Sequence, residues 1–426
     1  MKRVHRAWFV ALSVFLVLIA SAAFRSSVGV MLDPIEDTFG WSRSSTSLAV
    51  AINLIFYGLT APFAAALMER YGVRVIASLA LLFISSGSLL TLVMNQTWHL
   101  VVLWGVLIGL GTGSTALVFG SLVVGRWFEK YRGVVFGVIG SAFATGQLIF
   151  LPIIAHTIEN SGWQEVSLWV GIGALILVPL VWFTIADSPA QVGLLPLGVD
   201  AHNYSPPMKS KTGGFETATK AIAELFSVYK SRIFILLATT FFICGWTTNG
   251  IISTHFVPAA HDHGMSTVTA SGLLAIVGIF DIAGTIGSGW LSERFDPRKL
   301  LAIYYSLRGV ALLAVPIVLG PNPDIPIFLT MMLFGLDWVA TVPPTVILCQ
   351  RAFGVEKGSV IFGWVFASHM IGAAIAASFS GLVRDQLGNY TMAWYFAGFL
   401  ALLAGVLALM IPKTNSNVND RTVQHL

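Results

Sequence analysis

The chain is organised around two related stretches, LMERYGVR at residues 67–74 and GWLSERFDPRK at residues 289–299. Each places an acidic–basic pair directly after a long apolar segment, Glu69-Arg70 in the first and Glu293-Arg294 in the second. The two pairs lie 224 residues apart, which is about half of the 426-residue chain. The sequence therefore predicts an internal duplication, in which the second half repeats the first.

The composition is that of a membrane protein. Hydrophobic residues make up 56% of the chain and charged residues only 10%, whereas a soluble domain carries roughly a quarter charged residues. Because these few charged residues cannot cover a water-facing surface, most of the outer surface must face lipid. The net charge of +4 is small and its basic residues are scattered between apolar segments, which excludes a basic patch for nucleic acid.

Twelve segments have the length of about 20 mostly apolar residues that a membrane helix needs. They are 8–31, 46–68, 74–94, 99–124, 133–155, 166–187, 232–257, 267–291, 300–320, 325–350, 358–383 and 389–412. The sequence predicts an all-α membrane protein with twelve transmembrane helices in two pseudo-symmetric six-helix bundles. We expect the bundles at 1–187 and 232–412, a polar linker at 188–231 and a tail at 413–426. Within the linker, the apolar and charged pattern of residues 217–229 predicts a short helix at the membrane surface.

The loop charges predict the orientation. With the spans above, 20 of the 24 Lys and Arg fall on the side that holds both termini, and basic loops stay cytoplasmic. We therefore expect both termini in the cytoplasm. The basic start and apolar run of residues 2–20 resemble a signal peptide, but removing them would cost the first half one span. Short loops without a cleavable leader favour the inner membrane of a bacterium.

The two loop stretches resemble the motif of the major facilitator superfamily, which reads Gly, any, Leu, any, Asp, Arg, any, Gly, Arg and a basic residue. Glutamate replaces the usual aspartate in both copies, and Ala65 and Asp296 replace one glycine each. The resemblance covers the whole chain and implies a transporter whose motif residues latch the cytoplasmic side. This predicted cytoplasmic gate comprises Glu69, Arg70, Arg74, Glu293, Arg294 and Arg298. The alternative is that these charges only set the topology of ordinary turns.

A narrower resemblance is to monocarboxylate porters and the oxalate–formate antiporter group. It rests on FGWSR at 39–43, four glycines within 105–113, RWFEKYRG at 126–133 and GIFD at 278–281. There are departures, because Thr285 stands where the eighth-helix motif has an arginine, and His369 is the nearest match to an eleventh-helix lysine. The resemblance implies a small organic anion, such as a monocarboxylate, as the substrate.

Four charged residues lie inside predicted spans, where charge is expensive and by default marks a substrate or ion path. Arg25 lies on the first span, which lines the cavity in the resembled fold, and an arginine fork suits a carboxylate. Its alternatives are a structural ion pair or snorkelling to the outer surface. Arg308 is either a second ligand or the partner of an acid. Asp281 or Asp337 is the predicted proton-coupling residue.

Uncharged polar residues in the spans supply further candidates. Tyr57, Asn249 and His369 are predicted to bind substrate, and His369 also titrates near neutrality. The alternative for each is a hydrogen bond between neighbouring helices. Pro343 and Pro344 should bend the tenth span, since proline removes a backbone donor.

The sequence argues against other chemistry. Cys244 and Cys349 lie apart in apolar segments and form neither a disulfide framework nor a metal site. GLGTG at 109–113 lacks the preceding strand of a dinucleotide loop, and HExxH or GxSxG motifs of enzymes are absent.

The sequence thus predicts a secondary transporter, not an enzyme, that moves a small organic anion by alternating access with proton coupling. We expect membrane lipid around it, no cofactor, no nucleic acid and function as a monomer. Rivals are an exporter of hydrophobic or cationic compounds, an anion exchanger and a non-transporting sensor.

Overall fold

The structure is a computed structural model that describes residues 5–131, 135, 138–139, 142–199 and 214–413. The described part is helical, without a β-strand, and within it each of the twelve predicted spans overlaps a helix or a run of helices. The N half, as we call residues 6–184, contains α1 (Arg6–Phe39), α2 (Arg43–Tyr71), α3 (Val73–Leu90), η1 (Thr91–Val93), α4 (Thr97–Leu100), η2 (Val101–Ile108), α5 (Gly109–Ser114), α6 (Leu117–Trp127), α8 (Ala142–Ser161) and α9 (Trp163–Thr184).

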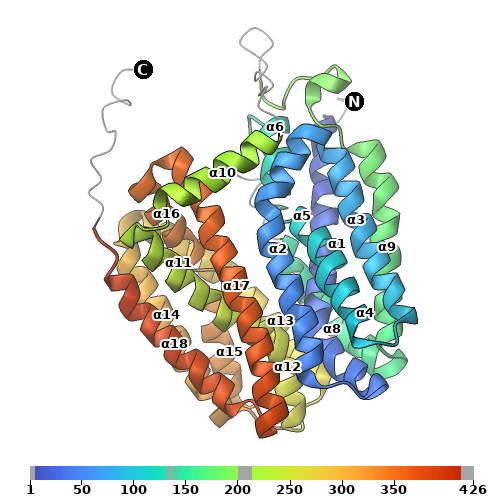
Figure 1. The fold of residues 1–426 in the computed structure, drawn as a ribbon, viewed down its shortest axis with the longest axis vertical. Helices are drawn as coiled ribbons and strands as arrows, with labels where there is room; N and C mark the ends of the chain where they lie inside the picture. The colour runs from blue at the N-terminus through green and yellow to red at the C-terminus, as the bar shows by residue number, and fades with distance from the viewer. Residues whose placement is uncertain (1–4, 132–134, 136–137, 140–141, 200–213, 414–426) are drawn as a thin grey trace.

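The second half of the chain follows a linker that contains η3 (Pro189–Val192) and α10 (Gly214–Val228). The C half, as we call residues 232–409, contains α11 (Arg232–Gly245), η4 (Trp246–Gly250), α12 (Ile252–Asp262), α13 (Thr267–Arg294), α14 (Pro297–Val318), α15 (Ile325–Asp337), α16 (Val342–Phe353), α17 (Val355–Leu387) and α18 (Thr391–Leu409). Figure 1 shows the blue-to-green N half beside the yellow-to-red C half.

Ten helices of the described residues are long and apolar enough to cross a membrane. The other two predicted spans, 46–68 and 133–155, include residues or side chains outside the described ones. Large apolar side chains on the outside are strongly exposed, such as Phe183 and Ile317 at 76% each. Such a surface is stable in lipid, where apolar groups need no burial, and the predicted all-α membrane fold is confirmed.

The bundle has two ends with different chemistry. We call proximal the end at which α1 begins and α18 finishes (Figure 1). The predicted surface helix is present as α10 at this end, where Lys357 Nζ binds Glu224 at 2.8 Å. We call distal the opposite end, which holds the turns after α1, α8, α12, α14 and α17.

The two halves pack together along three helix pairs, α2 with α17, α8 with α13, and α1 with α12. Glycine allows a close approach of α1 and α12, because a Cβ on Gly29 of α1 would lie 2.6 Å from the carbonyl oxygen of Ser253 on α12. The interface between the halves is thus built from the first, second and fifth spans and their counterparts.

Three spans are interrupted. The fourth is broken at Thr115 and Ala116, between α5 and α6, where the sequence predicted one continuous helix. The seventh contains the π-helical turn η4, a feature frequent at functional sites. The tenth breaks between Asp337 and Val342, as Pro343 and Pro344 predicted.

Candidate functional site

A cavity lies between the halves, near the middle of the interrupted seventh span. It is bordered by α1, α2 and α8 of the N half and by η4, α12 and α13 of the C half. Its volume of about 40 Å³ holds only about three water molecules. The cavity is therefore narrow in this conformation. The residues that line it include Arg25, Asn53, Leu54, Asn249 and Leu274.

Arg25, which lines this cavity, contacts the predicted residue Tyr57. The Arg25 guanidinium carbon lies 4.0 Å from the centre of the Tyr57 ring, so the cation sits over the aromatic face. Such stacking is favourable and orients the planar guanidinium, a group whose geometry suits a carboxylate. Beside them, the Asn53 side chain donates to the Trp104 carbonyl oxygen at 2.6 Å and so ties α2 to η2.

The predicted residues Asn249 and His369 also meet. The Asn249 amide, which borders the cavity, donates to His369 Nε2 at 3.1 Å. His369 is buried between two aromatic rings, stacked on Phe366 and close to Phe241. The histidine thus supports the cavity wall through Asn249 and does not itself line the cavity.

Arg308 and Asp337 form a buried pair in the C half, away from the cavity lining. Arg308 Nε lies 2.6 Å from an Asp337 carboxylate oxygen, and both side chains are almost fully buried. This is the ion pair that the sequence left as the alternative for Arg308. The same guanidinium donates to the main-chain carbonyl oxygens of Asp337 at 2.6 Å and of Trp338 at 3.3 Å.

Asp281 binds the other side of the same break. Its carboxylate accepts the backbone N–H of Val339 at 3.0 Å and the hydroxyl of Thr285 at 3.0 Å. Thr285 is the position where the resembled motif has an arginine, so the departure gives Asp281 a hydroxyl in place of a cation. One turn further along α13, the Ser288 hydroxyl donates to the Ala340 carbonyl oxygen.

These side chains satisfy the main chain that the break leaves open. Pro343 and Pro344 have no N–H to offer the carbonyls four residues earlier, and Ser288 serves one of these carbonyls. Arg308 places a cation at the carbonyl end of α15, and Asp281 an anion ahead of the N–H end of α16. Each charge opposes the partial charge of a helix end, which is how non-helical backbone is tolerated at membrane depth.

The predicted gate residues at the proximal end bind within their own halves. Arg74 donates to the Ile185 carbonyl oxygen at 2.8 Å, and Arg298 to Ile411 at 3.0 Å. Arg70 lies over Tyr71, while Arg294 lies over Trp290 and 3.8 Å from Glu293. The side chain of Glu69 lies outside the described ones. In this conformation these contacts do not reach the other half.

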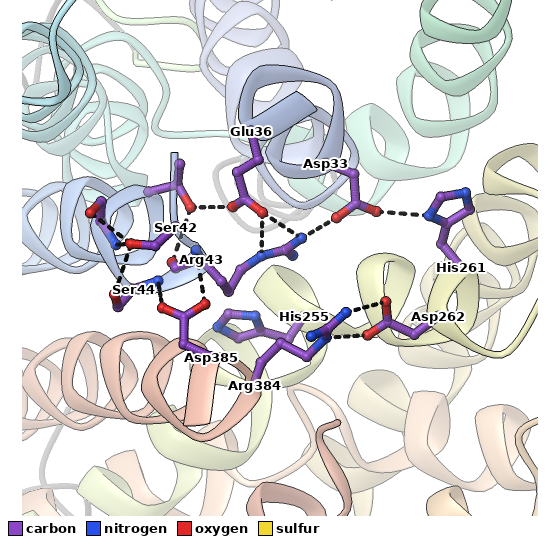
Figure 2. Close-up of polar contacts among 12 residues, drawn as sticks. Asp33, Glu36, Ser42, Arg43, Ser44, His255, His261, Asp262, Arg384 and Asp385 are labelled. Atoms are coloured by element: carbon purple, nitrogen blue, oxygen red, sulfur yellow. Dashed lines mark hydrogen bonds and ion pairs between the residues drawn. The ribbon is translucent and has the colours of Figure 1, made fainter. Parts of the chain in front are cut away.

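The distal end carries a polar network that the sequence reasoning missed (Figure 2). In the N half, Asp33 and Glu36 of α1 bind the Arg43 side chain at the start of α2, Glu36 at 2.9 Å. Asp33 also reaches His261 of the C half, with 3.3 Å between carboxylate oxygen and Nδ1. This hydrogen bond raises the pKa of His261 above its usual value.

Two further distal contacts cross between the halves through backbone N–H groups. Asp385 of α17 accepts the N–H groups of Arg43 at 3.1 Å and Ser44 at 2.8 Å. Glu159 of α8 accepts the N–H of Val268 at 3.2 Å. The distal end is therefore closed by bonds between the halves.

Comparison with other sequences places the chain in a family. The sequence profile described as Major Facilitator Superfamily matches residues 14–377. The MFS-type transporter YcxA of Bacillus subtilis (strain 168) is 29% identical over 391 residues, 90% of each chain. Monocarboxylate transporter 12 of Homo sapiens is 22% identical over 415 residues, which cover 94% of this chain and 79% of the relative.

Comparison of structures gives the same fold. A D-xylose–proton symporter superposes with a TM-score of 0.71 at 15% identity, covering 96% of this chain and 99% of the symporter. An inward-facing, occupied bacterial homologue of the human lysosomal transporter Spinster reaches 0.72 at 14% identity, covering 95% and 97%. The chain belongs to the major facilitator superfamily and is a multi-pass membrane transporter, not an enzyme.

Proposed function

We propose that this transporter moves a small organic anion, a monocarboxylate, across the membrane by alternating access, with a proton as the coupling ion. The observation that carries the proposal is the placement of Arg25 at a cavity between the two halves. A guanidinium is always charged and binds a carboxylate through two parallel hydrogen bonds. An anion bound at this point would be exposed to each side of the membrane in turn as the two halves rock against each other.

The surroundings of Arg25 support a substrate with one charged and one apolar end. Tyr57 fixes the guanidinium by stacking, and Asn249 supplies a side-chain amide on the opposite wall. Leu54 and Leu274 add apolar surface from α2 and α13. Such a mixture of few polar groups and apolar wall is usual for small-molecule sites, and a short-chain monocarboxylate matches it. The name of the human relative also fits this class.

The coupling proton is assigned to Asp281 or Asp337, with Arg308 as the cation that responds. Protonation of Asp337 would remove the charge that neutralises Arg308, and protonation of Asp281 would remove the anion at Val339 N–H. Either event would loosen the break of the tenth span.

Orientation and gating follow from the positive charge of the proximal loops. We assign the proximal end to the cytoplasm of a bacterium, with both termini inside and the protein acting as a monomer in the inner membrane. The gate residues Arg70, Arg74, Arg294 and Arg298, with Glu69 and Glu293, would bind across the halves when the proximal end closes.

The test is uptake of radiolabelled carboxylates into proteoliposomes of the purified protein, with and without an inward proton gradient. The panel should contain short-chain monocarboxylates and dicarboxylates of matched length. Uptake of a monocarboxylate that is stimulated by the gradient and abolished by a protonophore supports the proposal. Uptake only into vesicles preloaded with a second anion would show an exchanger instead. No flux of any acid would contradict the anion assignment and favour the exporter of hydrophobic or cationic compounds.

A further inference from the structure

The distal end contains two cross-half contacts that are copies of each other. α2 and α13 are equivalent helices of the two repeats, and each begins with a capping serine, Ser42 and Ser266. These serines lie 224 residues apart, the same offset that separates the two loop motifs. The N–H groups of Ser44 and Val268, which donate the cross-half hydrogen bonds to Asp385 and Glu159, are 224 residues apart as well.

The N–H groups in the first turns of α2 and α13 bind two kinds of acceptor, a serine hydroxyl and a carboxylate. A helix begins with four N–H groups that lack a partner within the helix. Ser42 accepts the N–H of Ser45, and Ser266 accepts that of Thr269. The capping serine thus accepts the N–H of the third residue of each helix, while a carboxylate from the other half accepts that of the second residue, and in α2 also that of the first.

The carboxylates of Glu159 and Asp385 lie at the C-terminal ends of their own helices, where a negative charge is unfavourable. Glu159 lies in the last turn of α8, and Asp385 in the last turn of α17. The end of a helix carries partial negative charge, so an acid there is locally unfavourable. The positive start of the opposing helix reverses that sign for both residues. Because α8 and α17 are also equivalent spans, the duplication has produced the same contact twice in opposite directions.

We infer that Glu159 and Asp385 are two equivalent latches, which hold the distal end closed by binding the N-terminus of α13 and of α2 across the halves. Both latches open together when the halves separate at this end, since the N–H groups then turn to water. The latches set the balance between the two orientations of the transporter, and they do so for any substrate. The inference does not depend on the proposed anion or proton.

The test is a distance measurement between spin labels at the distal end. Asn95 in the N half and Asn322 in the C half lie on exposed distal turns, so N95C and N322C carry the labels. The two native cysteines are buried, and the chain without engineered cysteines gives the background. Electron–electron double resonance in nanodiscs then reports the fractions of distally closed and open protein.

The variants remove the charge in steps. E159Q and D385N keep the shape of the side chains, and each should raise the open-to-closed ratio about two- to five-fold. The double variant should give about the product of both effects, and E159K with D385K a larger one. E165Q is the matched control, because Glu165 is a distal acid in the first turn of its own helix α9. It should leave the ratio unchanged.

The salt dependence of the open-to-closed ratio provides a second test. The effect of E159Q and D385N should shrink in about 1 M salt, where charges are screened beyond about 3 Å. The inference is overturned if the double variant and the lysine variant keep the wild-type ratio at low salt while eluting as monodisperse protein. It is also overturned if E165Q opens the distal end as much as E159Q does. A failure of carboxylate uptake would leave these distance results unaffected.

Discussion

At the scale of single residues, Arg25 shows that a charged residue inside an apolar span can predict a functional position. The sequence singled it out because a cation inside an apolar span is costly, and the structure places it at a cavity over Tyr57. Arg308 was singled out by the same rule, and the structure pairs it with Asp337. Sequence alone could not separate the two cases, since the partner of a charge depends on helix rotation and packing.

The stacking on Tyr57 predicts different results for two replacements of that residue. Tyr57→Phe keeps the ring under Arg25 and should leave the KM for carboxylate uptake close to the wild-type value. Tyr57→Leu removes the ring and should raise KM about two- to five-fold, the size of a modest cation–π interaction. Uptake kinetics in proteoliposomes measure both values. Equal effects of the two replacements would show that the ring does not position the arginine.

At the scale of elements, the tenth span illustrates a break that composition could predict and partners that it could not. Pro343 and Pro344 predicted the bend of the tenth span. The fourth span contains no proline, and its break at Thr115 was not predicted. The groups that stabilise the tenth-span break come from α13 and α14, far away in the sequence. Only the packing of three helices brings them together.

The brace around this break predicts a loss of stability when Ser288 is changed. Ser288→Ala leaves the Ala340 carbonyl oxygen without this donor and should lower the free energy of unfolding by about 0.5–2 kcal/mol. Ser271→Ala is the control, because Ser271 is buried in the same helix and its hydroxyl has no hydrogen-bond partner among the described residues. Thermal unfolding in detergent should separate the two variants. Equal unfolding midpoints would contradict the bracing role.

At the scale of the whole molecule, the bilayer explains why the sequence predicted the fold but not the contacts that close the distal end. Twelve apolar segments and one-sided loop charges are imposed by the bilayer, so each span was located from composition. Glu159, Asp385 and His261 lie in the last turns of their helices, outside the apolar part of each span, and their partners belong to the other half. The equal spacing of Ser42 and Ser266 was the available signal, because it repeats the offset of the loop motifs.

The His261–Asp33 contact predicts that distal closure depends on pH. The pKa of His261 is raised while it binds Asp33, so protonation and closure favour each other. The extra stability of the closed state is fully present below the ordinary histidine pKa of about 6.5 and is lost as pH rises through the raised pKa. Other charges near this contact are Glu36, Asp37, Arg43, Asp262 and Arg384.

The same spin-label pair measures this dependence. The closed fraction of the wild type should rise on acidification, and His261→Asn should abolish the histidine-dependent part of the change while keeping a polar side chain next to Asp33. A pH profile of His261→Asn that matches the wild type would assign the dependence to other groups.

The measurement that tests the central claim most directly is the KM of carboxylate uptake for Arg25→Gln in proteoliposomes, beside the wild type and Arg25→Lys. Loss of a charge-assisted pair of hydrogen bonds should raise KM for the glutamine variant at least about ten-fold. Arg25→Lys keeps the charge without the planar fork and should fall between the two. Uptake by Arg25→Gln with an unchanged KM would contradict the claim that Arg25 binds the substrate carboxylate.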